Sequence, residues 1–254
     1  VLPVGHRIET PAMTIRHLGT SGQEAEPDHM DPENIRRTVD WMVKNRLNFS
    51  FALRPQVLWQ KLPPGEGNPW DRRGGMVRWQ HIVHNLTFIL PNEKYFESNP
   101  EYYALYRGRR VPVGPERGNL ALTNLEVRER VAAFVVDWFE QHPDGRVVPL
   151  VPPDGAIRWD ESPAAMELGG RNFTPGPEGS MTRRMVEFTG AVAERVGERF
   201  PDRFILNLAY SNYVEPYPGL SLPENVIAQV AHGYAGHGSF VHSIFSPRNE
   251  EARE

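Results

Sequence analysis

The amino-acid sequence predicts an α/β fold of the TIM-barrel type, a (β/α)8 barrel truncated after roughly six strands. Three observations lead to this prediction. Short apolar runs alternate with amphipathic helical patterns, which is typical of parallel strands joined by right-handed crossovers. The chain has 254 residues, a length at which an α/β barrel forms one domain. The 24 prolines and 22 glycines fall mainly between the periodic segments, where they indicate long, shaped loops.

Charge and cysteine content exclude several classes of protein. The chain carries 28 basic and 32 acidic residues, a net charge of -4, and no block of lysine and arginine. This balance argues against a nucleic-acid partner and against binding to an anionic membrane surface. No run of 18 apolar residues is present, so we expect no insertion into a membrane. Cysteine is absent, which excludes disulfides and cysteine-ligated metal.

The first half of the chain is predicted to hold three strands and one helix. A strand at residues 11–18 ends near Arg16, a polar side chain that we assign to substrate binding. Asp31 is a suitable cap for a helix, and the apolar residues after it recur at spacings of four and three. Strands are predicted at residues 47–53 and 81–90, and a proline ends the second of these.

The second half continues the alternation of helices and strands. Residues 93–106 are rich in aromatic side chains, and we expect short helical turns there, packed on the mouth of the barrel. Two amphipathic helices follow, one capped by Asn124 and one by Ser180. Buried strands are predicted at 204–209 and 226–231, and a closed barrel would need two strands more. We therefore interpret the chain as one TIM-barrel-like domain, a fragment of a longer multidomain protein that holds the remaining barrel strands.

Residues 147–161 form the strongest candidate for a functional site. A short apolar strand stops at two prolines, and Asp154, Trp159, Asp160 and Glu161 follow. Ligands of parallel α/β proteins bind where the strands end. Carboxylates act on glycosidic bonds, and an indole ring packs on the apolar face of a sugar. The pattern therefore favours a carbohydrate site, and the alternative is a solvated acidic loop above a packed tryptophan.

The three acids are assigned different roles. Glycoside hydrolysis needs a protonated carboxyl group and a second group that meets the positive charge at the reacting carbon. We assign the acid to Glu161, which desolvation against Trp159 would keep protonated, and we assign to Asp160 the polarisation of a substrate acetamido group. Asp154 is the third catalytic candidate, and the alternative for it is a turn-forming role, which is ordinary for an aspartate before a glycine.

Polar residues at other strands are candidates for substrate binding. His84 lies in the predicted third strand, and Tyr210 and Asn212 follow a later one. Each is a candidate contact for a sugar hydroxyl, and the alternative for each is packing in the core. His232 and His237 lack an acidic neighbour at ligand spacing, so we expect no metal. No phosphate-binding glycine loop, nucleophile elbow or dinucleotide fingerprint is present, and we expect no cofactor.

Several short segments together carry a family resemblance. They are residues 40–48, 95–105, 107–110, 122–127, 154–155, 200–202 and 223–226. Each segment alone is a weak signal, but their order along the chain makes the set more specific. The set resembles a bacterial family, domain-of-unknown-function family 4838, which is allied to glycoside hydrolase family 163.

The resemblance implies a TIM-type barrel within a secreted or periplasmic protein of glycan-degrading bacteria. Characterised relatives cleave the β-N-acetylglucosaminide core of complex N-glycans from within. By the same resemblance, His84 matches a family histidine, and Asp154 matches the aspartate of an Asn-Asp-Gly motif in which Pro153 here replaces the asparagine. Residues 156–161 stand where many relatives carry a cysteine-rich cluster. These two departures bear on substrate and activity rather than on the fold.

Two functions are therefore expected from the sequence. The first is a glycoside hydrolase-like domain that cleaves an oligosaccharide or polysaccharide at a β-N-acetylhexosaminide, by acid catalysis with help from the acetamido group of the substrate. The second is a non-catalytic carbohydrate-binding relative that keeps the barrel. A different barrel hydrolase that shares only the architecture is a further alternative. Besides the glycan, the expected partners are the flanking domains of the longer chain.

Overall fold

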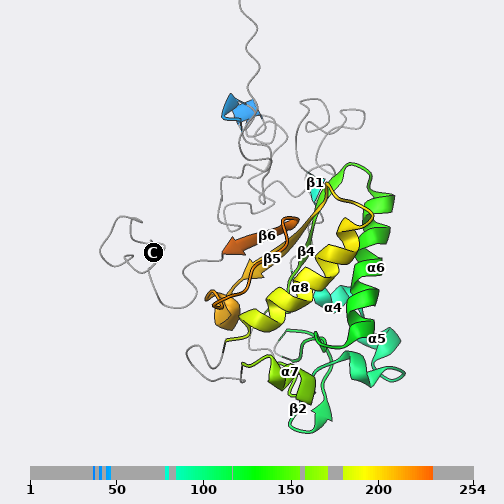
Figure 1. Ribbon diagram of the computed structural model, residues 1–254. Coiled ribbons are helices and arrows are strands. Elements are labelled where there is room, and N and C mark those ends of the chain that lie inside the picture. Colours follow the sequence, from blue (N-terminus) through cyan, green and yellow to red (C-terminus); the bar gives the residue numbers. More distant parts are fainter. Residues whose placement is uncertain are drawn as a thin grey trace, which may run out of the picture. The chain divides into compact units, whose positions relative to one another are not determined.

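The computed structural model divides the chain into two units, residues 1–81 and residues 82–254, and each is described by itself (Figure 1). In the first unit it describes residues 37, 40, 41 and 44–46 and the two-residue strand β1 (Arg78–Trp79). In the second unit it describes residues 84–115, 117–154, 158–170 and 180–230.

The described residues of the first unit confirm part of the helix predicted after Asp31. Asp40, Trp41 and Lys44 are helical, and Lys44 Nζ lies 2.5 Å from Asp40 Oδ2, one turn earlier. The side-chain amide of Asn45 donates to the carbonyl oxygen of Trp41 at 2.8 Å, which satisfies a carbonyl at the end of this helix. The strands predicted at residues 11–18 and 47–53, and with them Arg16, lie outside the described residues.

Three parallel strands form the sheet of the second unit. They are β4 (Gly145–Leu150), β5 (Phe204–Ala209) and β6 (Val226–Val230), in that spatial order. β4 pairs with β5, and β5 pairs with β6, both in parallel. Most residues of β4 and β5 are buried on both faces, as expected for central parallel strands, whereas β6 is more exposed. The predicted β5 is confirmed at both ends, and β6 ends one residue before its prediction.

Two long helices, α6 (Leu125–Gln141) and α8 (Thr182–Gly197), pack against each other and against this sheet (Figure 1). The predicted cap of α6 is confirmed, because the Asn124 side chain accepts hydrogen bonds from the backbone amides of residues 126 and 127. The cap predicted at Ser180 is one residue early, since α8 has Met181 at its N-cap without a side-chain bond, while the hydroxyl of Ser180 accepts from the amide of Thr182 at 3.3 Å. The apolar face predicted for each helix is the face that packs in the core.

The strand predicted at residues 81–90 is wrong for the residues that are described. His84 adopts a left-handed backbone, with φ of 59°, and the chain then forms the short helix α4 (Leu86–Ile89). The side chain of Asn85 bonds to the end of β4 and to the residue that follows it. Its Oδ1 accepts from the amide of Val151 at 3.1 Å, and its Nδ2 donates to the carbonyl of Pro149. The buried amide side chain of Asn85 therefore makes the kind of hydrogen bonds to β4 that the backbone of a strand would make.

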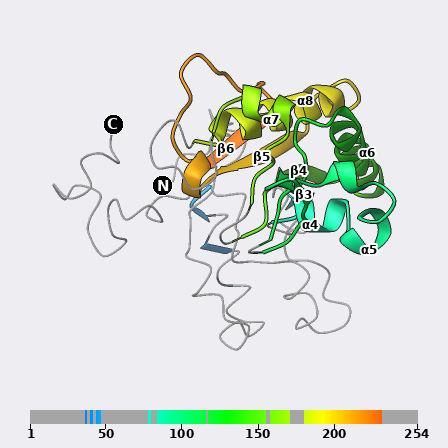
Figure 2. The ribbon, with the colours of Figure 1, turned by 90° about the horizontal axis from the view of Figure 1, so that it is seen from below.

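The helical turns predicted in residues 93–106 are confirmed as α5 (Asn92–Tyr95) and a 3-10 turn, η2 (Pro100–Tyr102). They lead into a hairpin of two short antiparallel strands, β2 (Leu105–Tyr106) and β3 (Arg109–Arg110) (Figures 1 and 2). The two turn residues between the strands have φ of 50° and 73°. Positive φ at both positions defines a type I′ turn, which explains the glycine at position 108.

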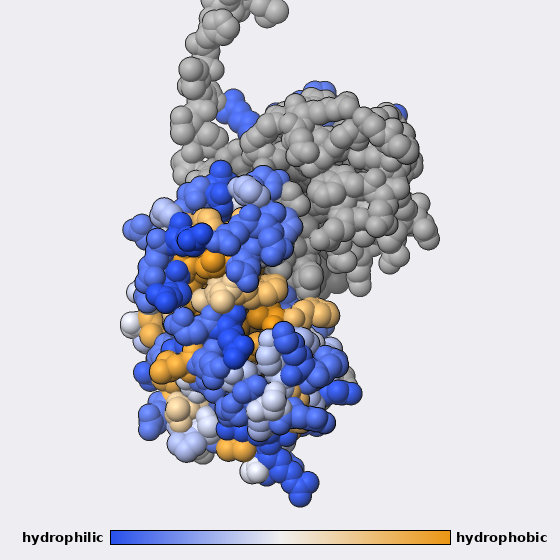
Figure 3. Space-filling view, turned by 90° about the vertical axis from the view of Figure 1, so that its right-hand side faces the viewer, coloured by the Kyte–Doolittle hydropathy of each residue, from blue (hydrophilic) through white to orange (hydrophobic). Residues whose placement is uncertain are grey.

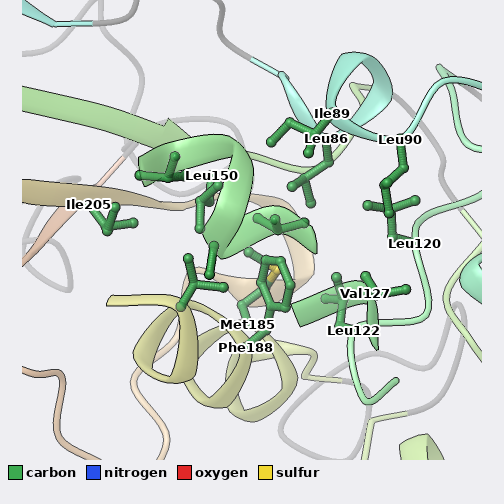
Figure 4. Packing of buried hydrophobic residues seen from close by; sticks show 14 of the residues in the cluster. Leu86, Ile89, Leu90, Leu120, Leu122, Val127, Leu150, Met185, Phe188 and Ile205 are labelled. Carbon is green, nitrogen blue, oxygen red and sulfur yellow. The ribbon is translucent and has the colours of Figure 1, made fainter. Parts of the chain in front are cut away.

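The core of the second unit lies between α6, α8, α4 and the sheet. Figure 4 shows Leu86, Val127, Leu150, Met185 and Phe188 in this cluster, one or more from each of these elements. All five side chains have no more than 1 % of their surface exposed. The core therefore joins the two helices and the sheet into one packed layer structure.

The TIM-type barrel stays a prediction, because no closed barrel is found among the described strands. In these residues β4, β5 and β6 are parallel, and helices pack on them. In the part of the chain that the structure describes, no helix combines the length and apolarity needed to span a membrane.

Candidate functional site

Polar side chains meet where β4 and β5 end. Beyond β4 the chain is buried as far as Pro153, and Asp154 then comes to the surface. Beyond β5, Tyr210 leads into a 3-10 turn, η4 (Ser211–Tyr213). The Tyr210 hydroxyl donates a hydrogen bond to Asp154 Oδ1 at 3.3 Å. Two residues predicted separately, 56 positions apart, are thus brought together at the carboxyl edge of the sheet.

His84 lies beside the chain that follows the end of β4. Its Nδ1 is 2.5 Å from the carbonyl oxygen of Pro152, two positions before Asp154. Because a carbonyl oxygen only accepts hydrogen bonds, Nδ1 carries the hydrogen, and Nε2 of a neutral ring is then an acceptor. The bonds of Asn85 to β4 hold this histidine in place.

Aromatic rings pack beside the ends of these strands. Tyr213 is buried, with Trp159 edge-on at 5.6 Å and Tyr210 edge-on at 6.3 Å between ring centroids. Burial raises the pKa of Tyr213, and the neighbouring Tyr210 and Asp154 act in the same direction. Trp159 is 2 % exposed, so its ring is part of the core rather than an open surface for a sugar. Asn212 is half-buried, and its carbonyl accepts from the amide of Met181 at 2.8 Å.

Asp160 has a different set of partners from Asp154. Its buried carboxylate accepts from the amide of Leu105 at 2.7 Å and from the amide and hydroxyl of Ser162 at 3.3 and 2.5 Å. Nη1 of Arg110 lies 3.8 Å from the same carboxylate. Asp160 therefore fixes the β2–β3 hairpin to the segment that follows β4.

Glu161 extends this attachment by one residue. Its Oε2 accepts from the amide of Arg107 at 2.7 Å, and its own amide donates to the carbonyl of Leu105 at 2.7 Å. Asp160 and Glu161 thus contact the hairpin, whereas Asp154 contacts Tyr210. The sequence grouped these three acids in one site, but the structure gives them two separate sets of partners.

Arg184 is a buried charge that the sequence did not single out. It is 2 % exposed, and its guanidinium donates to the carbonyls of Asp160, Gly169 and Gly170 at 2.5, 2.7 and 3.0 Å. Burial lowers its pKa, and the charges of Asp160 and Glu161 oppose that shift. The signal was present, since Arg184 lies one turn before Phe188, on the apolar face of α8.

Metal binding has no support among the described residues, where no group of three or more histidine and acidic side chains could hold an ion. His232 and His237, considered above as a weak metal pair, lie outside the described residues. The candidate site therefore consists of Asp154, Tyr210, His84 and Asn212.

Fold and site together define an α/β protein with polar side chains at the carboxyl ends of a parallel sheet. The chain belongs to the family described as Domain of unknown function (DUF4838), whose model matches residues 23–247. No curated protein and no solved structure gives a match. The resemblance to this family is thereby confirmed, and the link to glycoside hydrolase family 163 stays a prediction.

Proposed function

We propose that this protein is a glycoside hydrolase-like domain, related to glycoside hydrolase family 163, with Asp154 as the carboxyl group that meets the substrate. The observation that carries the proposal is the hydrogen bond of 3.3 Å from the Tyr210 hydroxyl to Asp154. It joins an exposed acid and a phenol at the carboxyl ends of two neighbouring parallel strands. Parallel α/β enzymes use this edge for substrate binding and catalysis.

The chemistry is hydrolysis of a β-N-acetylhexosaminide with help from the substrate. The carboxyl group of Asp154 gives its proton to the glycosidic oxygen, and the bond from that oxygen to C1 breaks. The acetamido oxygen forms a new bond to C1, so that a cyclic intermediate replaces an enzyme nucleophile. Water then attacks C1, opens the ring and returns a proton to Asp154. One carboxyl group is sufficient for both proton transfers.

The other side chains of the site are assigned to binding. Nε2 of His84 forms a hydrogen bond with a sugar hydroxyl, because Nδ1 is used by Pro152. Tyr210 orients the Asp154 carboxyl group. Asn212, in the turn after Tyr210, donates and accepts through its amide. From the family resemblance, the same proposal includes a location in the periplasm or outside the cell.

The second candidate function is carbohydrate binding without catalysis. It is favoured by the contacts of Asp160 and Glu161, whose carboxylates accept hydrogen bonds from the backbone of the hairpin. Asp154 is then the exposed acid among the three candidates weighed, and a single exposed carboxylate also suits hydrogen bonding to sugar hydroxyls. A binding protein needs the polar strand ends but no proton donor.

Turnover by the full chain separates these candidates. The substrates are an aryl β-N-acetylglucosaminide and a complex N-glycan, and the variants are Asp154→Asn and Glu161→Gln. Under our proposal Asp154→Asn lowers kcat at least about 100-fold. The matched control Asp137→Asn, an exposed aspartate on α6, leaves kcat unchanged. Loss of turnover in Glu161→Gln with a normal melting temperature would instead return the acid to Glu161. No turnover by the unaltered chain, with retained glycan binding, would support the binding protein.

A further inference from the structure

The β2–β3 hairpin gathers arginine side chains around one tyrosine. The guanidinium carbon of Arg107 lies 5.2 Å from the centre of the Tyr106 ring, and that of Arg158 lies 5.7 Å from it. Arg109 is the cross-strand partner of Tyr106. Directly paired residues of an antiparallel ladder project to the same face, so Arg109 joins the group. We call Tyr106, Arg107, Arg109 and Arg158 the arginine platform.

Hydrogen bonds to two neighbouring segments hold the arginine platform in place. The hairpin is attached to Asp160 and Glu161 by the three backbone-directed bonds described above. Arg158 is fixed in turn by its amide, which donates to the carbonyl of Arg117 at 2.9 Å. Arg117, an exposed residue, is thereby brought beside the platform. Groups held in position before binding lose less conformational entropy when a ligand arrives.

Exposed arginines outnumber the acids beside the hairpin. Arg107, Arg109 and Arg117 are exposed and make no ion pair with any residue that the structure describes. The carboxylates beside these arginines are those of Asp160 and Glu161, which accept hydrogen bonds from the hairpin backbone. Elsewhere on this unit five arginines are each paired with an acid, at Arg130–Glu126, Arg146–Asp202, Arg183–Glu187, Arg195–Glu198 and Arg199–Glu140.

This contrast is local, because the whole chain has a net charge of -4. In Figure 3 the lowest part of the molecule, where Figure 1 places the hairpin, is hydrophilic. The hairpin lies next to the segment that leaves the carboxyl end of β4, since that segment holds Asp160 and Glu161. The arginine platform therefore contacts the segment that follows Asp154, a residue of the candidate site.

We propose that the arginine platform binds the anionic groups of an acidic oligosaccharide, either uronate carboxylates or sulfate esters. The planar guanidinium presents paired donors that match the oxygens of both anions, and Tyr106 keeps two guanidinium groups in place. The inference rests on the proposed function, and it narrows the substrate class of that site from glycans in general to glycans that carry negative charge.

Calorimetric titration of the full chain tests this inference without turnover. The ligands are tetragalacturonic acid, its neutral methyl ester and a chondroitin 4-sulfate tetrasaccharide. The test variant is Arg107→Asn with Arg109→Gln. Asn-Gly is a preferred pair for a type I′ turn, so this variant keeps the hairpin. The control variant, Arg195→Gln with Arg199→Gln, removes the same number of positive charges near the C-terminal end of α8.

We expect at least one of the two anionic tetrasaccharides to bind about tenfold more tightly than the methyl ester, and the test variant to lose that advantage. Because chondroitin 4-sulfate carries carboxylates as well as sulfates, the desulfated chondroitin tetrasaccharide is titrated beside it, and a loss of affinity on desulfation assigns the binding to sulfate. Equal affinity for the methyl ester and both acidic ligands would overturn the inference, as would an equal loss in the control variant. A raised salt concentration should weaken acid binding and leave ester binding unchanged.

The same proteins separate this inference from the proposed function. Asp154→Asn should keep the anion-dependent affinity and lose turnover. Anion-dependent binding in a chain that hydrolyses nothing would contradict the hydrolase and support the platform. Hydrolysis of neutral N-acetylglucosaminides with no anion dependence of binding would support the hydrolase and contradict the platform.

Discussion

The carboxylate of Asp160 accepts a hydrogen bond from the backbone amide of Leu105 at 2.7 Å, across 55 positions of sequence. It is the contact by which the segment after β4 holds the β2–β3 hairpin. We expect Asp160→Ala to lower the free energy of unfolding by about 1–3 kcal/mol for each buried donor left without an acceptor. Chemical denaturation measures this loss.

Two controls accompany the Asp160 variant. Asp137→Ala changes an exposed residue of α6 and should stay within about 0.5 kcal/mol of the unaltered protein. Asp160→Asn keeps an acceptor oxygen toward Leu105, so it should lose less stability than Asp160→Ala. A stable Asp160→Ala protein that lacks only glycan turnover would show that Asp160 acts on the substrate instead.

Arg184 and Arg183 are neighbours in sequence with opposite surroundings. Arg184 is buried among carbonyl oxygens, whereas Arg183 is a partly exposed residue paired with Glu187 one turn later. Arg184→Met should lower the free energy of unfolding by about 3 kcal/mol, because it leaves buried carbonyls unpaired. Arg183→Met should lower it far less, because its ion pair with Glu187 is exposed to solvent. Similar losses in the two variants, measured by denaturation, would contradict the anchoring role of Arg184.

Asn85 should contribute strongly to the stability of the sheet edge. It is 1 % exposed and bonds to the backbone at two positions of the chain at and just beyond the end of β4. Asn85→Ala leaves a buried donor and acceptor unpaired, so we expect a loss of about 2–3 kcal/mol in the free energy of unfolding. Thr87→Ala, at a half-buried position of the same helix, is the control. Hydrogen exchange at the amide of Val151 should rise in the first variant alone.

Tyr103 predicts how stability falls at alkaline pH. Burial raises its pKa from 10.0 to about 12, with smaller contributions from the charges of Glu93 and Tyr95. Because the folded state holds the phenol proton more tightly than the unfolded state, this contribution is fully present below pH 10. It is lost as the pH rises through about 12. Tyr103→Phe should flatten this loss between pH 10 and 12 while costing stability at pH 8, since the hydroxyl donates to Leu90.

The sequence predicts the long elements of the second unit well. The helix after Asn124 combines a cap with a sustained apolar period, α8 shows the apolar period, and β5 is a buried apolar run bounded by polar residues. These signals are local, and the structure keeps them. The strand prediction at residues 81–90 is wrong for the described residues, because an apolar run of this length fits a strand or a short helix equally well. The pairing of Asn85 with β4, which decides between them, is a tertiary contact.

The candidate site was predictable as separate residues but not as an arrangement. Asp154 and Tyr210 were each placed at a strand end, and their contact follows from the parallel pairing of β4 with β5. Asp160 and Glu161 have their partners in a hairpin more than 50 positions earlier, which no local pattern reveals. Arg184 could have been found, because a charged side chain on the apolar face of a helix requires buried partners.

The side chain of Asn85 also sets a limit on how β4 can be extended sideways. The bonds of Asn85 use the carbonyl of Pro149 and the amide of Val151, which point to the edge of β4 that β5 does not occupy. A strand that pairs with β4 along this edge must therefore end before Pro149. A short amide side chain thus occupies two backbone groups at the end of β4 that a neighbouring strand would otherwise use.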